Sequence, residues 1–539
     1  MKPWGEDMVN NKQNHLLKGA LILSIAGMIS KILSAFYRVP LQNLTGDLGY
    51  YVYQQIYPFI GIFMMLSLYG FPAAVSKLTI ERKIKRENIS FKNFTRPIII
   101  ILLIFSLLLA VCLFSFSPFL AEMIEDEKLI PSYQLLSLSF LLIPLLSFYR
   151  GYFQGMGDMR PTAYSQVLDQ IFRVCIIIVT AVLINKGLIN TYSLSIWAVY
   201  ATILGGIIGT SVLLIFKYRE PSITNHKTNN KIPWRYFINV LFMFGIIAAL
   251  NHMVLLLLQL ADIFTLVPEL INYGHDKSDA MGIKGIFDRG QPLIQFGAVL
   301  GSSFALALIP EITQKKATSK QKTIQIIKDS LTISFYLAAG ATLGLILIFP
   351  EANLLLFENK SGTGSLQVLM LSILLGSIAI TSNAVLQSYG YFKQITLYII
   401  GMFAIKYFLN YLLVAKLGII GSSLATVISL LFLSGLSLLF LKNKITKQSF
   451  LKMINWRAFI YAALCMSTSL LAFKYSLANL VSEWRFLLFI YIIVVVSVGA
   501  MIYLLLLLRF NALSQRQLNT LPLTTIILKI EKIAKYKRR

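Results

Sequence analysis

The sequence predicts an all-α polytopic membrane protein with about 14 transmembrane helices. Of its 539 residues, 57% are hydrophobic and only 13% are charged, whereas a soluble domain has about 25% charged residues. The mean hydropathy is +0.71. Apolar windows long enough to cross a bilayer follow one another along the chain, and no polar stretch between them is long enough for a soluble domain.

The apolar windows, each of about 20 residues or more, define the expected spans. The first window follows a polar N-terminal stretch, and no cleavage site comes after it, so we expect a retained helix rather than a signal peptide. In chain order the windows lie at residues 16–38, 56–78, 97–120, 131–156, 162–184, 193–217, 234–262, 283–309, 325–349, 363–389, 393–415, 419–441, 456–476 and 484–508.

Basic residues gather in alternate loops, and this pattern predicts the orientation. They follow the second, sixth, eighth and twelfth windows and fill the C-terminal tail, whereas the loops after the third and seventh windows are poor in Lys and Arg. Short cytoplasmic loops carry the excess of Lys and Arg, so both termini are predicted to be cytoplasmic and the protein to lie in the cell membrane. The same distribution accounts for the net charge of +26 without a nucleic-acid partner.

The C-terminal segment 520–539 alternates apolar and basic residues at helical spacing. This pattern predicts an amphipathic helix on anionic membrane lipids. A tail that binds a partner protein is the alternative.

A weak internal repeat predicts two lobes. At a constant offset of 233 residues, Gln154 matches Gln387, Gly157 matches Gly390, Arg160 matches Lys393 and Arg173 matches Lys406. Each copy is expected to be a helix–turn–helix. Parallel repeats of this kind are a known transporter plan, with the ligand between the lobes. We therefore predict two six-helix lobes related by a pseudo-two-fold axis, followed by two extra helices and a tail. Their bounds are residues 1–220 (spans 1–6), 233–445 (spans 7–12), 456–508 (spans 13 and 14) and 509–539 (basic tail).

Charged residues inside the apolar windows are the candidate binding residues, because an intramembrane charge is costly and usually functional. Lys31 and Arg38 are seven residues apart and should share one helix face; the alternative is that both reach the lipid headgroups. Asp288 and Arg289 begin the eighth span. They could form a local ion pair, or Arg289 could cap a carbonyl. Two guanidinium groups facing across a cleft would suit a pyrophosphate, which Arg binds in a bidentate manner.

A second group of charges has a more structural interpretation. Asp169 and Arg173 are four residues apart, which favours an intrahelical salt bridge over a position in the cavity. Lys406, the repeat mate of Arg173, has no carboxylate four residues away and could face the cavity. Asp262 could be a cation ligand or an interfacial residue, and Arg150 stays ambiguous.

Enzyme and cofactor motifs are not found in the sequence. There is no GxxxxGK[ST] nucleotide loop and no HExxH zinc motif, so neither an enzyme nor a direct ATP-driven pump is expected. Cys112, Cys175 and Cys465 lie in apolar windows and are expected to be small buried hydrophobes. Gly205 and Gly209 form a small-xxx-small pair, typical of helix packing.

The runs SKILSAFYR, at the first span, and DRGQPLIQFGAVLGSSFALALIPEI, at the eighth, resemble the MurJ-type lipid II flippases of the MOP exporter superfamily, in the Gram-positive branch that includes spore-cortex proteins. The resemblance extends over nearly the whole chain. It implies a monomeric flippase without a cofactor that moves undecaprenyl-pyrophosphate-linked lipid II to the outer leaflet by alternating access. The membrane potential or an unspecified coupling ion would drive the cycle, and the cell-wall synthesis machinery is a potential partner.

The resemblance carries the family's basic cavity residues onto Lys31, Arg38 and Arg289, with Asp288 beside them. One departure is that the Gram-negative branch has an additional Arg in the second span, where this chain reads IGIFMMLSLYG. The alternatives are a flippase for another undecaprenyl-linked oligosaccharide, such as a teichuronic acid, capsule or spore-cortex unit, a MATE-like multidrug/cation antiporter, and a non-transporting scaffold. A drug antiporter usually needs acidic cavity residues, whereas the intramembrane charge of this chain is mainly basic.

Overall fold

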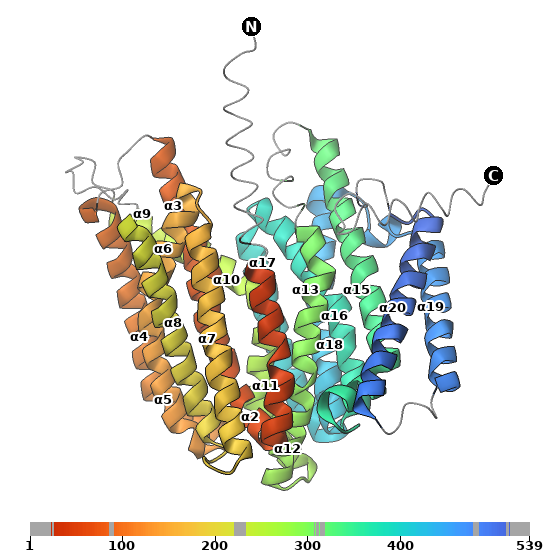
Figure 1. The fold of residues 1–539 in the computed structure, drawn as a ribbon. Coiled ribbons are helices and arrows are strands. Elements are labelled where there is room, and N and C mark those ends of the chain that lie inside the picture. Colours follow the sequence, from red (N-terminus) through yellow and green to blue (C-terminus); the bar gives the residue numbers. More distant parts are fainter. Residues whose placement is uncertain are drawn as a thin grey trace. The chain divides into compact units, whose positions relative to one another are not determined.

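The computed structural model describes residues 26–85, 91–219, 233–306, 319–477 and 484–513, together with the single residues Leu23, Leu308, Ile312 and Gln517. These residues form helices and short connections, with no strand among them, which confirms the predicted all-α class (Figure 1). The C-terminal segment 520–539 lies outside the described residues, so its predicted amphipathic helix stays a prediction.

By its contacts the chain divides into two compact units, residues 1–268 and 269–539. In the first unit, η1, η2 and η5 are π-helical and η3 and η4 are 3₁₀ turns. Its elements are α2 (Arg38–Met65), η1 (Leu66–Gly70), α3 (Phe71–Ile84), η2 (Phe91–Thr95), α4 (Arg96–Met123), η3 (Glu127–Leu129), α5 (Ile130–Ser139), η4 (Phe140–Leu142), α6 (Ile143–Met156), α7 (Arg160–Asn185), α8 (Ser193–Arg219), α9 (Trp234–Asn239), η5 (Val240–Ile246), α10 (Ile247–His252) and most of α11 (Val254–Tyr273).

The second unit holds the remaining helices, of which η6 is π-helical and η7 a 3₁₀ turn. They are α12 (Lys277–Asp288), α13 (Gly290–Leu306), α15 (Lys320–Phe357), α16 (Thr363–Ser388), α17 (Phe392–Leu417), α18 (Ile419–Leu441), η6 (Lys442–Thr446), η7 (Phe450–Met453), α19 (Trp456–Leu477) and α20 (Arg485–Arg509).

The division by contacts falls within α11, later than the boundary that the sequence placed between residues 220 and 233. The reason is local packing, since η5 and α10 lie against η1 and α3. A Cβ atom on Gly70 would come within 2.8 Å of the Gly245 carbonyl oxygen and of Ala249 Cβ. Gly70 therefore lets the two chain segments approach backbone to backbone. The predicted six-plus-six lobe plan stays a prediction.

Thirteen helical segments are long and apolar enough to cross a membrane among the described residues. The first two sequence windows lie in one helical run, Ala26–Ile84. A turn at Tyr37 and non-helical backbone at Gly46 (φ 70°, ψ −175°) interrupt this run, and residues 39–55, between the two windows, are otherwise helical. The seventh window divides into two helices around Met253, and the eighth corresponds to α13, which has 17 described residues.

The turns of the predicted repeat have the same geometry. Gly157 (φ 94°) ends α6 and Gly390 (φ 84°) follows α16, both in the left-handed region that favours glycine. The amide of Gly157 donates to the Gln154 carbonyl (3.1 Å), and that of Gly390 donates to the Gln387 carbonyl (2.9 Å). The helix–turn–helix expected in both copies is confirmed.

The cysteine prediction is wrong. Cys112, Cys175 and Cys465 are all exposed on the surface of the described structure. Helix α4 shows why, since Leu103, Leu107 and other apolar residues around its circumference are also exposed. In a membrane helix the lipid-facing side is as apolar as the packed side, so hydrophobic surroundings in the sequence do not indicate burial.

The last two helices pack against α15 within the second unit. Gly340 of α15 leaves room for the ring of Tyr503 of α20, since a Cβ atom there would lie 2.6 Å from Tyr503 Cε1. The Tyr503 hydroxyl donates to the Tyr336 carbonyl oxygen at 2.8 Å. The apolar core around this contact also includes Met466 and Leu470 of α19.

Candidate binding site

Arg38 begins α2, and its side chain is 0% exposed. Its guanidinium carbon lies 4.0 Å from the centroid of the Tyr57 ring. Among the described residues, none of its three guanidinium nitrogens has a hydrogen-bond partner of good geometry. Burial excludes the alternative in which this side chain reaches the lipid headgroups. A buried guanidinium without a carboxylate or a well-aligned acceptor is expensive.

Tyrosines surround this guanidinium. Tyr50, Tyr53 and Tyr57 follow one another at helical spacing on α2 and are buried, and with Tyr37 they lie within electrostatic reach of Arg38. The Tyr37 and Tyr53 hydroxyls are hydrogen-bonded to each other. We call Arg38 and these four tyrosines the Arg38 cluster.

The same helix buries amide oxygens near the cluster in sequence. Gln42 donates to Asp47 at 2.9 Å, yet its Oε1 and that of Gln54 are buried with no donor among the described residues. Neither these amides nor the tyrosines were identified from the sequence. The available signal was the repeated tyrosine and glutamine in YYVYQQIYP, at the start of the second apolar window.

Lys31 has a different environment from Arg38. Its side chain is exposed, although the seven-residue spacing predicted one shared face. A turn at Tyr37 interrupts the helix between the two residues. Lys31 lies within electrostatic reach of His252, and the His252 ring stacks on Tyr69 at 4.3 Å between centroids. The binding role proposed for Lys31 therefore stays a prediction.

In the second unit, Arg289 follows α12 and is also 0% exposed. Its Nη1 donates to Asn359 Oδ1 at 2.6 Å, and its guanidinium carbon lies 5.3 Å from the Phe357 ring centroid. Asp288 accepts a hydrogen bond from Lys284, four residues earlier, and both are buried. Lys284 was missed from the sequence, although its i,i+4 spacing from Asp288 was visible. Arg289 is therefore hydrogen-bonded to the protein, whereas Arg38 has no hydrogen bond of good geometry among the described residues.

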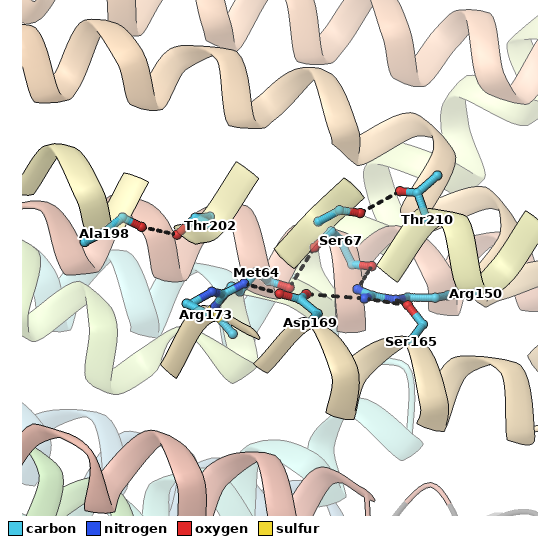
Figure 2. A network of polar contacts seen from close by, with 10 residues as sticks. Met64, Ser67, Arg150, Ser165, Asp169, Arg173, Ala198, Thr202 and Thr210 are labelled. Atoms are coloured by element: carbon cyan, nitrogen blue, oxygen red, sulfur yellow. Dashed lines mark hydrogen bonds and ion pairs between the residues drawn. The ribbon is translucent and has the colours of Figure 1, made fainter. Parts of the chain in front are cut away.

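Asp169 on α7 is buried between two arginines (Figure 2). Arg173 Nη2 lies 2.6 Å from Asp169 Oδ1, which confirms the predicted intrahelical salt bridge. Arg150 Nη2, from α6, lies 3.6 Å from Asp169 Oδ2. One carboxylate thus partly neutralises two guanidinium groups, and the arginine that the sequence left ambiguous belongs to this cluster.

Arg150 also holds the π-helical segment η1 in place. Its Nη1 donates to the Ser67 carbonyl oxygen at 3.2 Å, and its Nη2 donates to Ser165 Oγ at 2.9 Å (Figure 2). A π-helical turn disturbs the usual i→i−4 hydrogen bonds, and the arginine supplies a donor at that point. The charges on α6 and α7 therefore form part of the helix packing of the first unit.

Two glycines on α8 make room for this charge cluster. A Cβ atom on Gly205 would come within 2.6 Å of Asp169 Oδ1, and one on Gly209 within 3.1 Å of Ser165 Oγ. The small-xxx-small packing expected from the sequence is confirmed, and its partner helix is α7.

Lys406 on α17 is fully buried. Its ammonium group lies among oxygen atoms of Asn410, Ser422 and Thr426 at 2.7–2.9 Å. These contacts place Lys406 in the packing between α17 and α18. The i,i+4 spacing of Asn410 was visible in the sequence, whereas the contacts to Ser422 and Thr426 were not, because these residues come from the next helix.

The family model described as polysaccharide biosynthesis protein matches residues 16–316, which is more than half of the chain. The chain belongs to this family. The uncharacterized membrane protein YabM of Bacillus subtilis is 34% identical, with 99% of each chain covered. The lipid II flippase MurJ of the same organism is 25% identical, over 64% of this chain and 66% of that one.

A solved structure has the same fold. The lipid II flippase MurJ in an inward closed conformation aligns with a TM-score of 0.63 at 16% identity, and the alignment covers 90% of this chain and 98% of that one. Identity this low shows the fold alone. Together with the family match and the apolar helices, it shows a multi-pass membrane protein of the polysaccharide biosynthesis family with the same fold as this flippase.

Proposed function

We propose that this family member is a flippase that moves an undecaprenyl-pyrophosphate-linked cell-wall precursor, lipid II, from the inner to the outer leaflet. Support comes from the family match and from the 25% identical relative whose name is lipid II flippase. The proposal also adopts the predicted cell-membrane location and the predicted cytoplasmic termini.

The observation that carries the proposal is Arg38. Its guanidinium is fully buried and has no acceptor of good geometry among the described residues. Protein interiors rarely leave such a group unpaired, because a charged donor loses its hydration without compensation. An anionic ligand would supply the missing acceptors. A pyrophosphate is a good candidate, because its oxygens match the fork of a guanidinium.

The surrounding tyrosines suit the same ligand. The Tyr57 ring already contacts the guanidinium through its face, a contact that favours the cation and lowers the cost of the empty site. Phenol hydroxyls can in addition donate to phosphate oxygens. The guanidinium of Arg38 would neutralise negative charge of the pyrophosphate, while the tyrosine hydroxyls would provide neutral hydrogen-bond donors.

Arg289 is the candidate for the second cation, with Asp288 and Lys31 as further proposed binding residues. The guanidinium of Arg289 contacts Asn359 through Nη1, and such a group has the fork geometry that a pyrophosphate requires. Arg173 and Asp169 pair with each other, so we assign them to helix packing rather than to direct ligand contact.

The test uses a strain that lacks every other lipid II flippase. Cells carrying Arg38→Ala should fail to export lipid II, and Arg38→Lys should export partly, because charge remains but the bidentate geometry is lost. Arg160→Ala is the matched control, since that arginine has a side chain 56% exposed and pairs with Asp158. The readout is lipid II in the outer leaflet, at equal protein level.

Two results would count against the proposal. Normal lipid II export by cells carrying Arg38→Ala would show that export does not need the buried guanidinium. Unchanged lipid II export after depletion of the wild-type protein, with accumulation of another undecaprenyl-linked oligosaccharide on the inner leaflet, would favour the alternative substrate class.

The proposed energy source is the membrane potential. After an anionic ligand leaves, an inside-negative potential pulls the basic site back toward the cytoplasm, by about 2.3 kcal/mol per elementary charge per 100 mV. An ionophore that collapses the potential at constant ATP should therefore reduce lipid II export. Unchanged export would point to a chemical ion gradient or to a partner.

A further inference from the structure

The ammonium group of Lys406 is enclosed by neutral oxygen atoms. Its Nζ donates to Asn410 Oδ1, to the Ser422 carbonyl and to Ser422 Oγ, each at 2.9 Å, and to Thr426 Oγ1 at 2.7 Å. Asn410 comes from α17, like Lys406 itself, and the other acceptors come from α18. Lys406, Asn410 and Ser422 are each 0% exposed, and Thr426 is 4% exposed. We call these four acceptor oxygens the Lys406 cage.

The cage has the chemistry of a monovalent-cation site. It combines an amide oxygen, a backbone carbonyl oxygen and two hydroxyl oxygens, all without formal charge. Alkali cations are held in proteins by oxygen atoms that replace the hydration shell, and backbone carbonyls alone can suffice. A lysine ammonium has three N–H donors, whereas four oxygens lie within hydrogen-bond distance of it here. At least two of these oxygens must therefore share one donor. The oxygens surround the charge much as ligands surround an ion.

The repeat-related position in the first unit has a different environment from that of Lys406. Arg173 occupies the matching position on α7 and pairs with the carboxylate of Asp169 at 2.6 Å. On α17 the residue that matches Asp169 is Met402, which is buried. Helix α17 contains no Asp or Glu, so the intrahelical salt bridge of the first unit has no counterpart there, and Lys406 instead donates to the four oxygens of the cage.

A third helix completes the site. The Phe287 ring of α12 lies 5.9 Å from Lys406 Nζ and presents its face to the cation. Phe287 directly precedes Asp288 and Arg289, so the cage contacts the helix end that carries the proposed binding residues of the second unit.

We propose that α17 and α18 form a monovalent-cation site whose resident cation is the tethered ammonium of Lys406. Removing that ammonium would leave oxygens able to bind free Na⁺ or K⁺. The wild-type protein would need no free cation at this place. This inference goes beyond the proposed flippase function and does not depend on it, because its test measures ion binding and stability rather than export.

The experiment compares the full-length wild-type protein with Lys406→Ala in detergent, in NaCl, KCl and choline chloride at equal ionic strength. Thermal unfolding and saturable binding of ²²Na⁺ or ⁸⁶Rb⁺ are measured. The wild type should unfold at the same temperature in all three salts. Lys406→Ala should unfold about 2 °C higher in NaCl or KCl than in choline chloride, once the cation is about 100 times above its dissociation constant.

Two control variants make the result specific. Lys416→Ala removes an exposed lysine from the same helix and should show no difference between salts. Lys406→Ala combined with Thr426→Val removes one cage oxygen and should lose most of the cation-dependent shift and of the saturable binding.

The contrary results are equally clear. Equal unfolding temperatures of Lys406→Ala in all three salts, without saturable cation binding, would overturn the proposal. Failure of Lys406→Ala to accumulate as folded protein in every salt would also contradict it, because a cage that binds a free cation should recover the fold. Recovery in NaCl or KCl but not in choline chloride would support it.

Discussion

Arg173 Nη2 lies 2.6 Å from Asp169 Oδ1, one helical turn away on α7, and both side chains are buried. The same carboxylate faces Arg150 at 3.6 Å. A single acidic residue thus balances part of the charge of two arginines inside the first unit. This relationship makes Asp169 the residue on which the stability of this cluster depends most.

We expect Asp169→Asn to destabilise the protein by about 3–5 kcal/mol, because it leaves buried guanidinium groups without their counter-charge. Asp158→Asn, which removes a salt bridge to the exposed Arg160, should cost about 1 kcal/mol or less. Thermal unfolding in detergent compares the two. Equal effects of the two variants would show that the buried cluster does not depend on its carboxylate.

A second prediction concerns the packing of α8 on α7. Gly205→Ala would place a Cβ atom within 2.6 Å of Asp169 Oδ1 and 2.9 Å of its carbonyl oxygen, so overpacking should cost about 1–3 kcal/mol. Gly435→Ala on α18 is the control, because a Cβ atom there meets nothing within 4 Å. Alanine favours a helix over glycine, so the control should be neutral or slightly stabilising. Similar unfolding temperatures for both variants would be inconsistent with the close approach.

The fold was largely predictable, whereas the pairing of the charges was not. Hydropathy and glycine turns are local properties, and they predicted the spans and the turns at Gly157 and Gly390. The contacts of Lys406 depend on which helix lies opposite, and a single sequence does not contain that information. Residues 39–55 lie between the first two predicted windows, yet they are helical except at Gly46, and their tyrosines are buried.

In the candidate site, too, the sequence identified the charged residues but not their contacts. Arg38 and Arg289 were identified because charge inside an apolar window is rare. Their different environments, an orphaned guanidinium in one and a contact to Asn359 in the other, required the structure.

A pH effect is expected at Tyr192, which lies in the connection between α7 and α8. Its hydroxyl donates to Asp126 Oδ2 at 3.0 Å, and burial together with that carboxylate raises the pKa of the phenol. The raised pKa means that the contribution of Tyr192 to stability is complete below its unfolded pKa of about 10 and is lost as the pH rises through the folded pKa. Tyr192→Phe should therefore lose less stability than the wild type when the pH is raised above about 10. Tyr218→Phe, at a position 93% exposed, is the control, and parallel curves for wild type and Tyr192→Phe would contradict the assignment.

The ligand-free protein should become more stable without the charge of Arg38. Arg38→Met keeps an apolar side chain of similar reach and removes a buried, orphaned guanidinium, which should raise the free energy of unfolding by about 1–3 kcal/mol after the contact with Tyr57 is lost. Arg160→Met on the surface should change it by less than about 0.5 kcal/mol. A destabilised Arg38→Met variant would mean that the residue serves packing, not ligand binding.

Affinity for the lipid-linked pyrophosphate tests the central claim most directly. Binding of purified lipid II to the wild type, Arg38→Ala, Arg38→Lys and Arg160→Ala can be measured by native mass spectrometry or by fluorescence titration in detergent. Loss of a charged hydrogen bond of about 1.5–3 kcal/mol predicts roughly 10- to 150-fold weaker binding for Arg38→Ala, an intermediate loss for Arg38→Lys and none for Arg160→Ala. Equal affinity of Arg38→Ala and the wild type for lipid II would contradict the account.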